Sequence, residues 1–173
     1  VIAEASGKIG EKISLRRFSV LTKTDDEVFG AYSHMGGKMT SIVKIANSTS
    51  EKARDVAMHV AAANPTYIDR SGIPQEVLDH ELQVLKAQAL AENEKAAKPK
   101  PENIIEKMVQ GRLNKNLKET CLVDQEFVKN PDETVGKFLG DGKVLEMVRF
   151  QVGEGMQKRE ENFAEEVAAQ MKG

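Results

Sequence analysis

The strongest pattern of apolar and polar positions lies in residues 50–64. Val56 and Val60 are one turn apart, and alanines around them complete one apolar helix face. Ser50 is suited to cap the first turn, and the proline after residue 64 ends the helix because a residue before proline is displaced from the α region. His59 follows Val56 by one turn, so it lies on or beside the apolar face. We therefore expect a core helix that carries one histidine.

Alternating apolar and polar positions predict strands on both sides of this helix. Residues 13–20 alternate with a change of parity at their centre, which is typical of a strand with a bulge or twist. Further strands are predicted at 28–33 and 39–46, and the longest at 144–152. Short connections favour antiparallel pairing, and the helix at 50–64 would cover one face of the sheet.

Two long helices joined by a polar loop are predicted for residues 74–93 and 101–117. Their apolar positions form a stripe narrow enough to be typical of a coiled coil. The Ala-Ala-Lys-Pro-Lys-Pro loop at 96–101 interrupts the helical pattern. We expect an antiparallel hairpin about 25–30 Å long that projects from the body. Its seam would consist of Leu78, Leu82, Leu85, Ala89, Ile105, Val109, Leu113 and Leu117.

Together these patterns predict an α+β fold. An antiparallel sheet would carry one covering helix, the antiparallel helical hairpin (a coiled coil) would be inserted into this core, and a C-terminal docking helix would follow. In that last helix Phe163 and Val167 are four residues apart, behind a Gly-Glu-Gly linker. The expected parts are 1–73 for the first part of the core, 74–119 for the hairpin, 120–153 for the return of the core with its closing strand, and 154–173 for the C-terminal helical module.

Composition narrows the classes of function. The 173 residues carry a net charge of −2, so we expect no large nucleic-acid footprint and no direct DNA binding. The single cysteine, Cys121, excludes an internal disulfide and fits a reducing compartment. No apolar run approaches the roughly 20 residues of a membrane-spanning helix, so no membrane partner is expected.

Motifs for catalysis are incomplete. Residues 136–143 resemble a phosphate-binding loop, but the spacing is wrong and Val144 stands where serine or threonine would bind magnesium. The three histidines share no ligand spacing, so neither a zinc site nor a cofactor is expected. A nucleophile pair of Cys121 and His59 has no supporting local motif. We therefore expect a binding protein and not an enzyme.

Six sequence blocks carry a resemblance to a known family. They are KIGEKISLRR at 8–17, VAMHVAA at 56–62, EKMVQGR at 106–112, TVG at 134–136, RFQVGEG at 149–155 and FAEEVAA at 163–169. In this order, over nearly the whole chain, they resemble translation elongation factor Ts, the guanine-nucleotide exchange factor for elongation factor Tu. Each block alone is weak, but the set is specific.

The resemblance implies an α/β core, an inserted coiled coil and a C-terminal module that docks on elongation factor Tu. It implies that the chain binds this GTPase and promotes GDP release during translation elongation, meeting the ribosome through that complex. The location implied is the cytoplasm, or the matrix or stroma of an organelle, and no cofactor is implied. The partner-binding residues implied are Ile9, Gly10, His59, Val60, Phe163 and Val167.

The chain departs from the family pattern at one place. The family has a Thr-Asp-Phe-Val motif, whose phenylalanine disturbs the partner's magnesium site, and this motif does not occur here. Val1 stands where the second half of the family's core begins. The resemblance therefore implies the C-terminal portion of a full factor, or a reduced relative.

The residues alone leave other interpretations open. His59 on an apolar helix face is most often a core histidine, and Ile9 with Gly10 also fits a simple helix end. The chain could be an interaction protein whose hairpin is the functional arm, or a ribosome- or RNA-associated protein. The last interpretation relies on basic residues along the hairpin, namely Lys98, Lys100, Lys107, Arg112, Lys115 and Lys118.

Overall fold

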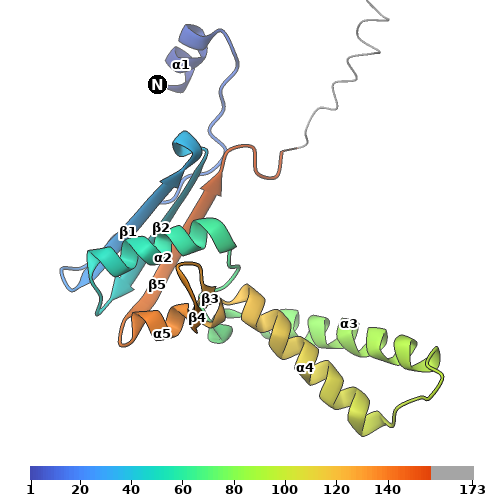
Figure 1. Ribbon diagram of the computed structural model, residues 1–173. Coiled ribbons are helices and arrows are strands. Elements are labelled where there is room, and N and C mark those ends of the chain that lie inside the picture. Colours follow the sequence, from blue (N-terminus) through green and yellow to red (C-terminus); the bar gives the residue numbers. More distant parts are fainter. Residues whose placement is uncertain (157–173) are drawn as a thin grey trace, which may run out of the picture.

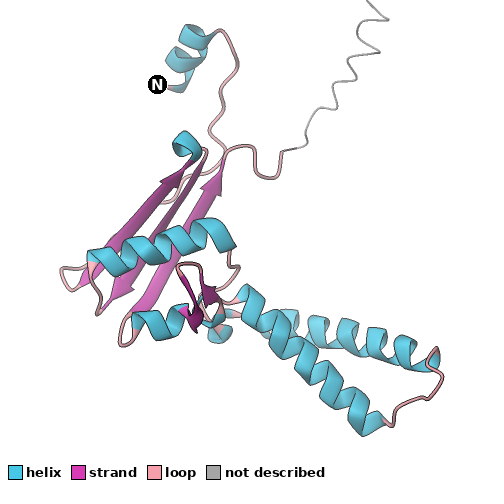
Figure 2. Cartoon of the chain, viewed as in Figure 1, coloured by secondary structure: helices cyan, strands magenta, loops and turns pink. Residues whose placement is uncertain are grey.

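The computed structural model describes residues 1–156. Helices and an antiparallel sheet are mixed, so the predicted α+β class is confirmed (Figures 1 and 2). In chain order the elements are α1 (Ile2–Ile9), β1 (Glu27–His34), the 3-10 turn η1 (Met35–Gly37), β2 (Met39–Ala46), α2 (Ser50–Ala63), η2 (Arg70–Gly72), α3 (Gln75–Glu94), α4 (Glu102–Thr120), η3 (Leu122–Asp124), β3 (Glu126–Phe127), β4 (Asn130–Thr134), α5 (Val135–Leu139) and β5 (Lys143–Gln151).

The main sheet has three antiparallel strands in the order β1-β2-β5. β1 and β2 form a hairpin in which Gly30 lies opposite Val43. β5 comes from the far end of the chain and pairs with the other side of β2 (Figure 1). The strands predicted at 28–33, 39–46 and 144–152 are thus confirmed to within one residue at each end.

α2 lies across one face of this sheet (Figure 2). Thr49 is its N-cap, because the backbone is extended there and its side chain accepts a hydrogen bond from the Lys52 N–H at 3.3 Å. The predicted cap, Ser50, is instead the first helical residue. The helix stops at Asn64, which adopts left-handed angles before the proline. The apolar face of α2 packs on the sheet and on the returning chain, in a core of Val43, Ile45, Ala53, Val56, Ala57, Val60, Leu122, Phe127, Val135, Leu139 and Val144.

The strand predicted for residues 13–20 is wrong. The chain there belongs to no helix or strand, and Phe18 is exposed. The two arginines at the parity change, Arg16 and Arg17, bind Glu154 beyond the end of β5. Side-chain contacts, and not a ladder of backbone hydrogen bonds, therefore hold this segment.

A small second sheet, β3 with β4, was not predicted from the sequence. Glu126 pairs with Thr134, and Phe127 pairs with Asn130. A strand of two residues is too short to show alternation, and Pro131 in β4 argues against a strand.

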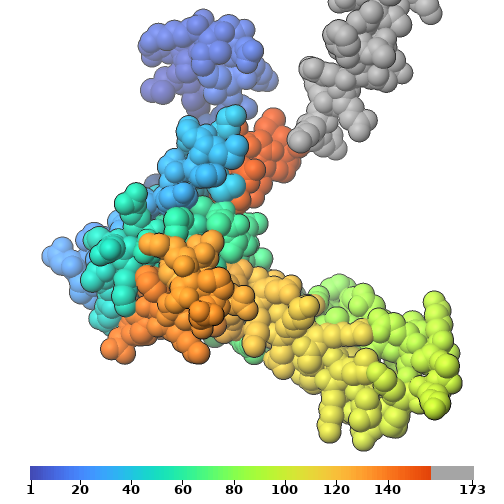
Figure 3. All heavy atoms as spheres, viewed as in Figure 1, coloured from blue at the N-terminus to red at the C-terminus, as the bar shows by residue number. Residues whose placement is uncertain are grey.

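The hairpin of α3 and α4 projects from the body (Figures 1 and 3). Its buried residues are Leu85, Ala89, Ile105 and Val109, which belong to the predicted seam. At the tip, the amide of Asn93 binds both backbone groups of Lys100, which closes the loop between the helices.

The hairpin helices span residues 75–120, and the division of the chain into four parts stays a prediction. The expected C-terminal docking helix, with Phe163 and Val167, lies outside the described residues. Within residues 1–156, no helix combines the length and the apolar character needed to cross a membrane.

Gly30 determines how closely β1 approaches α2. A Cβ atom at this position would lie 2.0 Å from the carbonyl carbon and oxygen of Ala53. We expect Gly30→Ala to lower the free energy of unfolding by about 2–3 kcal/mol, because the helix backbone must move away from the sheet. Urea unfolding followed by circular dichroism measures this change.

Gly111→Ala is the matched control. Gly111 lies inside α4 with open space where its Cβ would stand, so alanine should raise the free energy of unfolding by about 0.5–1 kcal/mol. A similar loss of stability in both variants would contradict the close approach at Gly30.

Candidate partner-binding site

His59, in the second half of α2, is only 1% exposed. Its Nε2 lies 2.8 Å from Gln125 Oε1, and the backbone N–H of Val128 donates to its Nδ1 at 3.2 Å. An amide oxygen only accepts and a backbone N–H only donates, so the network assigns the ring proton to Nε2 and makes the ring neutral. Both ring nitrogens are therefore used inside the protein.

Gln125 extends this contact to the root of the hairpin. Its Nε2 donates to the carbonyl oxygen of Glu119, in the last turn of α4, at 2.7 Å. The ring of Phe127 packs against His59 with 6.0 Å between centroids. His59 thereby connects α2, the returning chain and the hairpin.

Backbone hydrogen bonds also join the two chain segments at the hairpin root. The Thr66 N–H donates to the Thr120 carbonyl, and the Leu122 N–H donates to the Tyr67 carbonyl, both at 2.9 Å. These bonds belong to the segments that enter α3 and leave α4. The hairpin is therefore tied to the body by backbone as well as by side chains.

A hollow of about 560 Å³ opens beside His59, between α2 and the hairpin root. His59 and Gln125 are buried and line its inner side. Its other lining residues include charges of both signs, among them Lys115, Lys118, Asp124 and Glu126. Charges of both signs can pair with complementary charges on a protein partner, and they distinguish this hollow from the mostly apolar pockets that bind small ligands.

The structure does not bring all the predicted site residues together. Ile9 ends α1 and is 62% exposed, and Gly10 follows it in the left-handed region, at φ 77°. α1 lies beyond the end of the sheet, away from α2 (Figure 1). Val60 is buried in the main core and does not line the hollow beside His59.

A cluster after β5 anchors the chain that carries α1. Arg17 forms an ion pair with Glu154 at 2.6 Å and lies over the Phe150 ring, 5.2 Å from its centroid. Arg16 donates to the Glu154 carbonyl. Local spacing could not predict this cluster or Gln125, because each contact joins residues far apart in the chain. The residues of the cluster do lie in the family-matching blocks at 8–17 and 149–155.

The geometry offers no support for a nucleophile pair of Cys121 and His59. Burial raises the pKa of the Cys121 thiol, which disfavours the reactive thiolate. Both nitrogens of His59 already bind Gln125 and Val128. Residues 1–156 hold no group of three or more histidine, cysteine or acidic side chains placed to bind a metal ion.

The fold and this site define an α+β protein that presents a projecting helical hairpin and a charged hollow at the hairpin root. The family model described as elongation factor TS matches residues 1–154. The chain belongs to the elongation factor Ts family, and it therefore has a role in translation elongation.

The buried histidine makes stability depend on pH. Burial lowers the pKa of His59 below its ordinary value of 6.5, and the hydrogen bond with Gln125 opposes this shift. The unfolded chain therefore binds the proton more readily than the folded chain, so the stabilisation is complete above about pH 6.5 and is lost as the pH falls below it. We expect urea unfolding to show a lower free energy at about pH 5.5 than at about pH 7.5.

His59→Asn removes the titrating group, so the free energy of unfolding should vary less between about pH 5.5 and about pH 7.5. His34→Asn is the control, because His34 is exposed, and it should leave the dependence as in the unchanged chain. If the free energy of unfolding of His59→Asn varied with pH as it does in the unchanged chain, His59 would not be the source of the pH dependence.

Proposed function

We propose that this chain is a guanine-nucleotide exchange factor for elongation factor Tu, which binds the GTPase and promotes GDP release. The family match over residues 1–154 carries the proposal. The mixed-charge hollow at the hairpin root supports it, because that surface suits a protein partner.

Exchange of this kind needs no covalent step and no cofactor. A factor that binds the nucleotide-free GTPase more tightly than the GDP-bound form must weaken nucleotide binding by the same ratio. A thousandfold faster release requires about 4 kcal/mol of stabilisation of the opened transition state. Contacts that displace the groups around the bound phosphates and magnesium can provide stabilisation of this kind.

The predicted residues take different roles in this proposal. Ile9 and Gly10 are exposed and contact the partner directly. His59 and Val60 are buried and hold the surface that the partner meets. Phe163 and Val167 dock on the partner from the C-terminal module. The ribosome is met through the complex with elongation factor Tu, in the cytoplasm or in an organelle that translates its own messages.

Release of a fluorescent GDP analogue from purified elongation factor Tu tests the proposal. The chain should accelerate release by orders of magnitude, and Ile9→Asp should reduce the acceleration by about tenfold, because a charge replaces an exposed apolar contact. Ile2→Asp is the control, since Ile2 is exposed at the other end of the same helix. Tight binding with unchanged release would refute exchange.

A second candidate function is that of an interaction protein whose hairpin is the functional arm. The projection of α3 and α4 from the body favours it (Figure 3). Deletion of residues 74–119 should then abolish binding of the partner, measured by co-sedimentation. Ile9→Asp should leave that binding unchanged. The RNA-binding interpretation is weakened, because Arg112, one of its basic residues, is paired with Glu92.

A further inference from the structure

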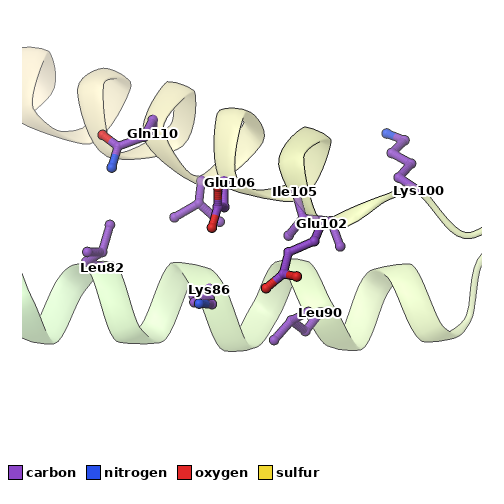
Figure 4. Close-up of a pocket in the computed structure, with 9 residues that line it drawn as sticks. Leu82, Lys86, Leu90, Lys100, Glu102, Ile105, Glu106 and Gln110 are labelled. Atoms are coloured by element: carbon purple, nitrogen blue, oxygen red, sulfur yellow. The ribbon is translucent and has the colours of Figure 1, made fainter.

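The two helices of the hairpin are linked by polar contacts that leave one groove open. Arg112 makes two hydrogen bonds to the carboxylate of Glu92, at 2.6 and 3.1 Å, and Asn116 donates to Glu81 at 2.7 Å. None of these four residues lines the groove of about 550 Å³ that opens between the same helices toward the tip (Figure 4). We call this the hairpin groove; its apolar lining is Leu82, Leu90, Ile105 and Val109.

The walls of the hairpin groove carry opposite charges. Lys86 on α3 lines one side, and Glu102 with Glu106 on α4 line the other. Lys100, just before α4, also lines the groove, but its Nζ lies 3.4 Å from Met108 Sδ on α4. Figure 4 shows both glutamates extending from α4 toward α3. None of these four side chains belongs to an ion pair formed within residues 1–156.

We propose that the hairpin groove docks a single amphipathic helix of a partner protein. Leu82 and Leu90 are two helical turns apart on α3, about 12 Å, which matches two turns of a helix laid along the seam. Leu90 is 41% exposed, although an apolar side chain of this size gains stability on burial. A third helix would cover it in the manner of helix-in-groove recognition.

The charged walls define the chemistry of that helix. Its apolar stripe lies on the leucines, an acidic flank faces Lys86, and a basic flank faces the glutamates. Turning a helix end for end exchanges its two flanks, so the walls select one direction of binding. A helix with two acidic flanks satisfies one wall and is repelled by the other.

This proposal does not depend on nucleotide exchange. The hairpin groove shares no lining residue with the hollow beside His59. The chain could fail to accelerate GDP release and still dock a helix on its hairpin.

A synthetic peptide of about four helical turns, with a leucine stripe, one glutamate flank and one lysine flank, is the probe. Titrated into the full chain labelled with nitrogen-15, it should shift the amide signals of residues 82–110. Leu90→Glu should weaken binding at least about tenfold, because it places a charge in the apolar contact. Val84→Glu is the matched control: Val84 is 36% exposed on the same helix, does not line the groove, and should leave the affinity unchanged.

Three results of the peptide experiments would overturn the proposal. The first is an absence of shifts in the groove, and the second is an equal effect of Leu90→Glu and Val84→Glu. The third is a peptide with two acidic flanks that binds as tightly as the mixed one. Sedimentation of the chain alone tests another occupant: a dimer that Leu90→Glu dissociates would assign the groove to a second copy and refute the partner helix.

Discussion

The packing of α2 on the sheet is the contact on which the other parts of this structure depend. At Gly30 the backbones of β1 and α2 approach so closely that no side chain fits between them. Further along the helix, the Ser41 hydroxyl donates to the Ala57 carbonyl at 2.6 Å, and Arg149 Nε donates to the Ala61 carbonyl at 3.1 Å. Each strand of the sheet therefore contributes one contact that fixes α2 in place.

His59 links α2 to the root of the hairpin. Because its two nitrogens bind the returning chain, and Gln125 binds the end of α4, the hairpin root cannot shift without breaking buried hydrogen bonds. The hollow beside His59 is therefore a preformed surface, and its shape depends on a neutral histidine. The segment that carries α1 is held differently, by exposed contacts of Arg16 and Arg17 with Glu154. The position of Ile9 therefore does not depend on the buried hydrogen bonds of His59.

Local periodicity was sufficient to predict the helices and strands that bury one face along many residues. The core helix, three strands and the hairpin seam could be predicted because their apolar spacing matches their burial. Residues 13–20 show the limit, since their alternation fits a strand but Arg16 and Arg17 find Glu154 instead. Gln125 was missed for a related reason: a polar residue in a loop gives no sign that it will be buried against a histidine 66 positions earlier.

The proposed exchange activity requires differential binding between two states of elongation factor Tu. A factor with equal affinity for both states cannot shift the equilibrium, however tightly it binds. The most direct measurement is the calorimetric affinity of this chain for elongation factor Tu, first nucleotide-free and then loaded with GDP and magnesium. The proposed exchange activity predicts tighter binding to the nucleotide-free form, by about 5- to 150-fold, the usual range of such a coupling. Equal affinities for the two forms would contradict it.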